Sequence, residues 1–266
     1  IELEEFEKAI TAFEACLAQN PNHISALRGM GIALIRLDRD VEALELLSKG
    51  LEGAPNDIPL LTHMGKALCR VGREEEGRKC MMKCVKLDPD SYELRIMAGE
   101  LCYLTDKYQK GIDQFKAALE MQPGHFDAMN YLVRSLITIE EWDEALEWCD
   151  KCLVVDPSNH EMMYQKGLCM SETDDRPGAL VCFDECLALC KDFVPAWTAK
   201  GNVLYWRARF EEALACCETA IALDPRGRLP WRNKSRCLLK LNRMEEALQA
   251  MFEYHLVDPT DDYCLD

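Results

Sequence analysis

The sequence predicts an all-α fold, a solenoid of antiparallel helix pairs, from two periodic features. The first is a period of 34 residues, marked by seven prolines and one lysine: Pro21, Pro55, Pro89, Pro123, Pro157, Lys191, Pro225 and Pro259. A fixed period of this length is typical of a helical repeat array, in which each repeat contacts only its neighbours. Strand signals are weak, and no domain boundary is visible.

The second feature is a pair of small residues that recurs in most units. If units begin three residues after each proline, the eighth position is Gly in five of seven units and the twentieth is Ala or Gly in all seven. Small side chains at these places let two helix backbones approach closely, while large residues at positions 4, 11 and 24 fill the surrounding space. Each unit is therefore predicted to be two antiparallel helices joined by a tight turn.

The predicted elements form a single array over 1–266. Residues 1–23 are the second helix of a partial unit, and residues 262–266 begin a further first helix. Aromatic residues recur where second helices should begin, at Phe6, Tyr108, Trp142 and Phe210. The full units are predicted at 24–57, 58–91, 92–125, 126–159, 160–193, 194–227 and 228–261. We expect both ends to continue in a longer protein.

One unit boundary departs from the proline pattern. Lys191 replaces the terminal proline, and Pro195 follows four residues later. Proline is tolerated in the first turn of a helix, because its missing N–H has no intrahelical partner there and its φ is already suitable. We expect Pro195 in the first turn of the next helix, with a local change of loop path.

This pattern closely resembles the tetratricopeptide repeat, a family with a 34-residue helix–turn–helix unit and small residues at positions 8, 20 and 27. The resemblance extends over residues 1–261 and departs from the family at Val133, Ser235 and Tyr254. It implies a right-handed superhelical solenoid whose first helices line a concave groove. Such a groove holds an extended or helical segment of another protein.

The overall charge argues against two classes of partner. The chain has 31 basic and 47 acidic residues and a formal net charge of −16. Nucleic-acid binding depends on Lys and Arg that neutralise phosphates, and anionic membranes attract basic segments. No apolar stretch is long enough to span a membrane. We therefore expect no nucleic-acid partner and no membrane partner.

At the groove positions that the resemblance implies, eight residues are basic and five are acidic, so the net charge of the groove is positive whereas that of the whole chain is negative. Such a reversal favours a protein or peptide partner with an acidic or acidic-aromatic segment. The alternatives are chance scatter of charge and, for each aromatic residue, ordinary packing. The predicted partner-binding residues are Arg28, Arg36, His63, Lys66, Arg70, Tyr103, Tyr131, Arg134, Tyr164, Asn202, Tyr205, Trp206, Arg232, Asn233, Arg236 and Lys240.

The chaperone-binding members of the family grip a terminal carboxylate with a lysine and an asparagine of one unit, an asparagine of the next, and a lysine and an arginine of a third, which lies outside this sequence. Asn202 and Asn233 match the asparagines, whereas Thr198 replaces the lysine. Capture of a chaperone tail is therefore not expected, although the two amides could hold a peptide backbone.

The fifteen cysteines are predicted to be mainly buried packing residues. Their odd number and their spacing along single helices argue against a secreted disulfide framework, and reduced thiols indicate a cytoplasmic protein. The alternative is a metal or redox site at Cys149 and Cys152, or at Cys182, Cys186 and Cys190. A closed zinc site needs four ligands, and His160 is the lone histidine candidate, so we predict no metal and no cofactor.

The sequence contains no motif of nucleotide-binding, hydrolytic or metalloprotease chemistry. His23 and His125 follow the unit prolines and are expected to be turn or capping residues. The predicted function is a scaffold or adaptor for protein–protein interaction, not an enzyme. The alternatives are a regulatory or substrate-docking segment of a larger enzyme or complex, and a homo-oligomer assembled through the terminal repeats.

Overall fold

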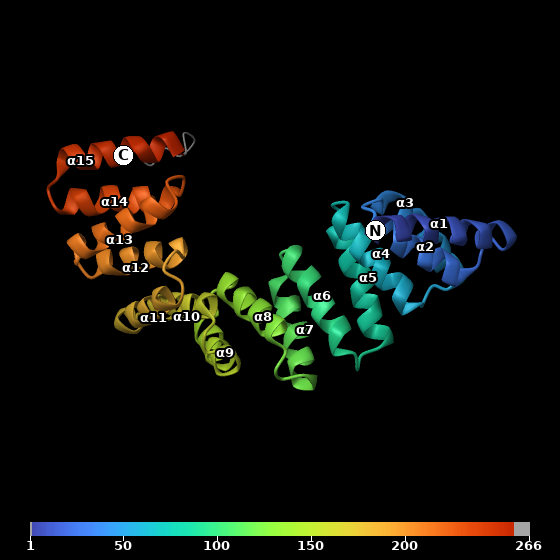
Figure 1. The fold of residues 1–266 in the computed structure, drawn as a ribbon. Coiled ribbons are helices and arrows are strands. Elements are labelled where there is room, and N and C mark those ends of the chain that lie inside the picture. The colour runs from blue at the N-terminus through green and yellow to red at the C-terminus, as the bar shows by residue number, and fades with distance from the viewer. Residues whose placement is uncertain (1, 258–266) are drawn as a thin grey trace. The chain divides into compact units, whose positions relative to one another are not determined.

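A computed structural model describes residues 2–257 (Figure 1), which contain fifteen α-helices and no strand. The predicted all-α repeat fold is confirmed. The chain divides into two compact units, Ile1–Ile139 and Glu140–Asp266, each considered by itself. The predicted helix start at 262–266 lies outside the described residues, and the division of the chain into one array with the bounds given above stays a prediction.

The helices alternate between two roles. We call α2, α4, α6, α8, α10, α12 and α14 the first helices, and the others the second helices. Unit 1 contains α1 (Glu2–Gln19), α2 (Ile24–Arg36), α3 (Asp40–Gly53), α4 (Ile58–Arg70), α5 (Glu74–Leu87), α6 (Tyr92–Leu104), α7 (Tyr108–Met121) and α8 (Phe126–Thr138). Unit 2 contains α9 (Trp142–Val155), α10 (His160–Glu172), α11 (Arg176–Leu189), α12 (Val194–Trp206), α13 (Phe210–Leu223), α14 (Arg228–Lys240) and α15 (Met244–Val257).

Paired helices approach most closely where both backbones carry small residues. At the contact of α4 with α5, a methyl group added to Gly77 would lie 2.7 Å from the carbonyl oxygen of Gly65 and 2.6 Å from Sγ of Cys69. Real Cβ atoms do not come so near, so glycine is needed there. In the α6–α7 and α10–α11 pairs, the fully buried rings of Phe115 and Phe183 fill the space beside the first helix.

A residue of positive φ follows every first helix, and after α2, α4, α6, α12 and α14 it lies in the same hydrogen-bonded turn. In α12 the N–H of Arg209 donates to the carbonyl of Leu204 and the N–H of Ala208 donates to that of Tyr205, both at 3.0 Å. These two bonds form a Schellman motif, which requires a positive φ at its central residue. The corresponding residues are Asp38, Gly72, Asp106, Glu140, Asp174, Ala208 and Asn242, with φ from 56° to 78°.

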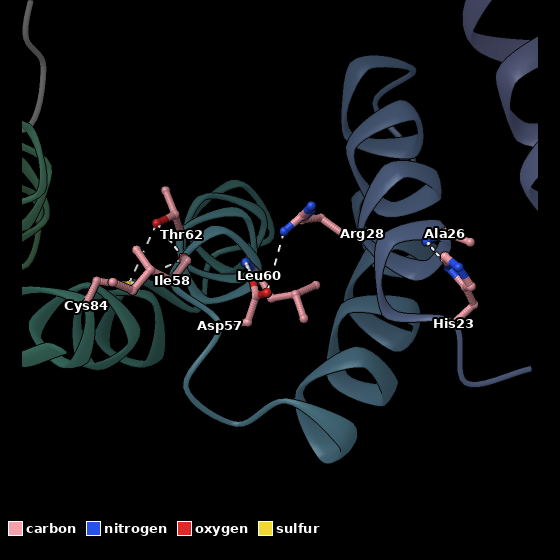
Figure 2. Close-up of polar contacts among 8 residues, drawn as sticks. All are labelled: His23, Ala26, Arg28, Asp57, Ile58, Leu60, Thr62 and Cys84. Carbon is pink, nitrogen blue, oxygen red and sulfur yellow. Dashed lines mark hydrogen bonds and ion pairs between the residues drawn. The ribbon is translucent and has the colours of Figure 1, made fainter. Parts of the chain in front are cut away.

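Most first helices begin at a side-chain cap. His23 and His125 accept through Nδ1 from the N–H groups of Ala26 and Ala128, so their predicted capping role is confirmed. Figure 2 shows the His23 cap and the equivalent bond from the N–H of Leu60 to Asp57. Ser91 and Asn159 cap α6 and α10 in the same way. Phe193 and Gly227, before α12 and α14, make no side-chain cap.

Pro195 lies in the first turn of α12, as the sequence predicts.

A regular ion pair joins neighbouring repeats of unit 2. Lys200 on α12 contacts Asp184 on α11 at 2.5 Å, and the Lys166–Asp150 and Lys234–Glu218 pairs repeat this contact at 2.7 and 3.1 Å. Each pair connects a first helix to the second helix before it.

Replacing Ala208 by glycine should stabilise unit 2. A side chain in the left-handed region costs about 1–2 kcal/mol, and glycine avoids most of this cost. We expect Ala208→Gly to raise the free energy of unfolding by about 1 kcal/mol. Ala215→Gly, on the exposed side of α13, should lower it by about 1 kcal/mol, because glycine disfavours a helix interior. Denaturant midpoints measure both, and a loss of stability in the Ala208 variant would contradict the turn analysis.

Candidate functional site

The first helices of unit 1 bring four predicted residues into one basic cluster. Burial lowers the pKa of His63 on α4, and the charges of Lys66, Arg28 and Arg36 lower the pKa further. These three cations therefore lie close enough to His63 to act on it. Arg28 also reaches Asp57 at 3.5 Å (Figure 2), so the α4 cap is joined to this cluster.

Arg70 is engaged elsewhere. Its guanidinium donates to the carbonyl of Ile35 at 2.9 Å, contacts the carboxylate of Asp38 and lies 3.3 Å from that of Asp40. The side chain thus joins the end of α4 to the turn between α2 and α3. This contact supplies a structural reason for an arginine at this position.

An aromatic cluster follows on α6 and α8. The rings of Tyr103 and Tyr131 meet edge to face at 5.6 Å, and Phe115 stacks on Tyr131 at 5.7 Å. Arg134 covers the Tyr103 ring, with its guanidinium carbon 5.3 Å from the ring centre, in a cation–π contact. Burial, followed by the charge of Glu100, raises the pKa of Tyr131. Three predicted residues therefore contact one another beside a carboxylate.

Unit 2 contains a pocket of about 490 Å³ between α10, α12 and α14. This size lies within the range of small-ligand and side-chain pockets. Four predicted residues meet in its wall: Tyr164, Asn202, Arg232 and Asn233. The other lining residues are Leu168, Val194, Pro195, Thr198, Ala199, Gly227, Arg228, Leu229 and Pro230. The pocket is thus largely apolar, with a few polar groups.

Two asparagine side chains lie in the wall of this pocket. Asn233 is only 6% exposed, and Asn202 is half-buried. Within residues 2–257, neither side-chain amide forms a hydrogen bond with another protein group. The amide atoms of Asn233 are not fully buried, so water or a ligand in the pocket can bond to them. The lining also includes two arginines and no carboxylate, in a chain of net charge −16.

The remaining predicted residues of unit 2 lie further along the same helices. Arg236 stands over the ring of Tyr205 at 4.3 Å and over that of Trp206 at 5.5 Å. Trp206 is 59% exposed, so this cation–aromatic cluster faces solvent. Lys240 is exposed at the end of α14, and Tyr164 packs edge to face on Phe193 at 5.4 Å. Tyr164 therefore both packs against a neighbour and borders the pocket, whereas the cation–aromatic cluster lies outside the pocket lining.

The cysteines of the described part are free thiols, and most are buried. Cys149 and Cys152 are both fully buried. A hydrogen bond to Cys169 and burial raise the pKa of Cys149, and burial raises that of Cys152 to about 11. Among residues 2–257, no group of three or more His, Cys, Asp or Glu side chains is placed to hold a metal ion. No helix in that range is long and apolar enough to cross a membrane.

Sequence models of known families match much of the chain. Four models, each described as a tetratricopeptide repeat, match residues 1–69, 58–91, 103–160 and 194–226. The chain belongs to the tetratricopeptide repeat family. No curated protein matches the sequence significantly.

Solved tetratricopeptide repeat structures share the fold. YrrB, described as having an unusual peptide-binding site, is 21% identical, with a TM-score of 0.59 over 71% of this chain and 97% of its own. The C-terminal part of a repeat protein from Cytophaga hutchinsonii is 13% identical, with a TM-score of 0.71 over 86% and 94%. A chain of the APC/C hetero-tetramer Cut9–Hcn1 is 13% identical, with a TM-score of 0.62 over 98% of this chain and 51% of its own.

Sequence reasoning missed the residues contributed by helix starts. Val194, Arg228 and Leu229 line the pocket because they lie in the first turns of α12 and α14. A signal was present in the sequence: Phe193 and Gly227 occupy cap positions that carry a capping side chain before the other first helices. Leu229 lies at position 2 of its unit, a groove position of the family, but the predicted binding residues are all charged, aromatic or amide side chains.

His63 should titrate below the value of about 6.5 for an unperturbed histidine. Since its folded-state pKa is lowered, the unfolded chain takes up the proton first as pH falls through 6.5. Protonation of His63 should therefore reduce stability as pH falls below that value. NMR titration of the imidazole measures the pKa, and Lys66→Gln should raise it. Lys49→Gln, on the exposed surface of α3, should leave it unchanged; equal effects would contradict the cluster.

Proposed function

We propose that this chain is a protein-interaction scaffold that binds an extended segment of a partner protein along the face formed by its first helices. The observation that carries the proposal is the pocket of unit 2, where Tyr164, Asn202, Arg232 and Asn233 meet around a space of about 490 Å³. Apolar walls with a few convergent polar groups are typical of binding sites. The peptide-binding site named for YrrB supports the same kind of function in a protein of this fold.

Two amides suit an extended peptide. An extended backbone presents both N–H and carbonyl groups, and an asparagine side chain can donate to one and accept from the other. Asn202 and Asn233 lie on neighbouring first helices, α12 and α14, which contact each other. A peptide bound across these helices would satisfy both amides and place a side chain in the pocket. Tyr164 and the Tyr205–Trp206–Arg236 cluster are the aromatic and arginine anchors of this surface.

The proposed partner segment is acidic. The basic cluster of Arg28, Arg36 and Lys66 in unit 1 and the two arginines of the unit 2 pocket give first-helix faces positive charge within an acidic chain. Complementary charge raises the association rate and favours acidic over basic partners. We further infer a role without catalysis, in a reducing cytoplasmic compartment that suits the free thiols. Homo-oligomerisation through the terminal repeats stays a prediction.

Peptides selected from a random peptide library should bind the pocket through the two asparagines. We expect Asn202→Ala combined with Asn233→Ala to weaken binding by about tenfold or more, because each lost hydrogen bond costs about 0.5–1.5 kcal/mol. Fluorescence polarisation measures the affinity. A control with Asn22→Ala and Gln249→Ala removes two exposed amides elsewhere and should bind normally. Selected peptides that bind all three proteins alike would show that the pocket is not the site.

The same peptides should be rich in Asp and Glu and should bind less tightly as salt increases. Exposed charge attraction is screened over about 8 Å at physiological ionic strength. Arg28→Gln with Arg36→Gln should reduce the salt dependence of peptides that bind unit 1, while Lys49→Gln with Lys79→Gln on second helices should not. Affinity that is independent of salt would contradict the acidic-partner proposal.

A further inference from the structure

Two pairs of cysteines recur at equivalent places in unit 2. In each pair, one cysteine lies at position 24 of a repeat, on a second helix, and the other lies at position 10 of the next repeat, on a first helix. The pairs are Cys149 on α9 with Cys169 on α10, and Cys217 on α13 with Cys237 on α14. All four residues have 0% exposure. The same arrangement of two buried thiols is thus built twice, two repeats apart.

Cysteine occupies these two positions only as a pair. At the other junctions between repeats, position 24 and the following position 10 hold Phe13 and Ala33, Leu47 and Ala67, Met81 and Leu101, Phe115 and Ser135, and Phe183 and Val203. Phe183 and Val203 belong to one buried cluster, so the two positions meet in the core between repeats. Met81 and Leu101 share another such cluster. A general preference for cysteine as a small buried residue does not explain why both partners change together.

The two thiols of each pair are in hydrogen-bond contact. Cys149 donates to Cys169, which raises the pKa of Cys149 and lowers that of Cys169. In the same way, a hydrogen bond from Cys217 to Cys237 raises the pKa of the donor and lowers that of the acceptor. Burial without such a partner instead raises the pKa of Cys152, to about 11. In each pair, the sulfur at position 10 is therefore the one on which a thiolate is favoured.

We propose that each pair is a site of reversible oxidation, at which hydrogen peroxide joins the two buried thiols in a disulfide. Cys169, as the thiolate, attacks one oxygen of the peroxide, and the O–O bond breaks to give a sulfenic acid and one water. The sulfur of Cys149 then attacks the sulfenic sulfur, which forms the S–S bond and releases the second water. Two thiols thereby lose two electrons and two protons, and the peroxide is reduced to water. Cys237 and Cys217 take the same two roles.

A disulfide in each pair would tie α10 to α9 and α14 to α13. α10 and α14 flank α12 in the wall of the unit 2 pocket, whereas α12 carries Val203 at the equivalent position. Each bond would close a loop of about 20 residues, which restricts the unfolded chain and so stabilises the folded one. Oxidation therefore restrains two of the three helices that form the pocket, whether or not the pocket binds a peptide.

Peptide mapping of the full chain tests the proposal. The reduced protein is treated with hydrogen peroxide under native conditions, the remaining thiols are blocked with N-ethylmaleimide, and tryptic peptides are analysed by mass spectrometry. Trypsin cleaves after Lys151, which separates Cys149 from the cysteine that follows it. We expect two cross-linked products, Cys149 with Cys169 and Cys217 with Cys237, both of which dithiothreitol separates. The thermal midpoint of the oxidised protein should rise by about 5 °C or more.

Two double variants separate these thiols from the others. Cys169→Val with Cys237→Val introduces the residue that α12 carries at this position, and it should abolish both cross-links and the rise in thermal midpoint. Cys152→Ala with Cys186→Ala also removes two buried thiols of unit 2, at position 27, where alanine occurs in other repeats. This control should keep both cross-links and the rise.

Two results would overturn the proposal. One is that the native protein keeps all four thiols free at a peroxide concentration that oxidises the exposed Met244 to its sulfoxide. The other is that oxidation joins different cysteines, or converts Cys169 to a sulfinic acid without a cross-link. Both results come from the wild-type chain, so they hold even if the valine variant fails to fold.

Discussion

The close approach of paired helix backbones is the constraint on which the other features depend. Where Gly77 faces the carbonyl of Gly65, no side chain fits between α4 and α5. Fixing two helices at this distance buries the inner side of the first helix and leaves its other side facing neighbouring first helices and solvent. The charged, aromatic and amide side chains of the candidate site lie on that free side. Binding residues can therefore vary without disturbing the pair that presents them.

The turns between first and second helices hold each pair in the orientation that this close approach requires. A residue of positive φ after each first helix, within a Schellman motif after α2, α4, α6, α12 and α14, helps to fix the direction in which the second helix leaves. Asp, Asn or Gly, which adopt a positive φ readily, occupy five of the seven turns. Glu140 and Ala208 adopt it at a cost in conformational free energy. Ala208 lies between α12 and α13, so the strained turn adjoins the helix that forms the centre of the unit 2 pocket.

The fold could be predicted because its determinants are local and periodic. Pro225, Gly201 and Ala213 each occupy a position whose chemistry recurs every 34 residues, so the helix pair could be inferred from spacing alone. Asn202 and Asn233 could be placed on one face by the same register. The pocket between them could not, because its volume depends on how Leu168 and Pro230 pack across three helices. Nor does periodicity predict that Arg70 is held by Asp38 and Asp40.

The two units differ in what a ligand must displace. In unit 1, Arg28 is paired with Asp57 and Arg134 covers Tyr103, so an incoming segment competes with existing contacts. Each exposed pair is weak, but its loss still offsets part of any new contact. In the unit 2 pocket, the amides of Asn202 and Asn233 have no partner in the described chain to give up. A ligand that bonds to these two amides replaces water and breaks no protein contact of either amide. Binding free energy should therefore be concentrated in unit 2, with unit 1 contributing mainly long-range attraction of acidic segments.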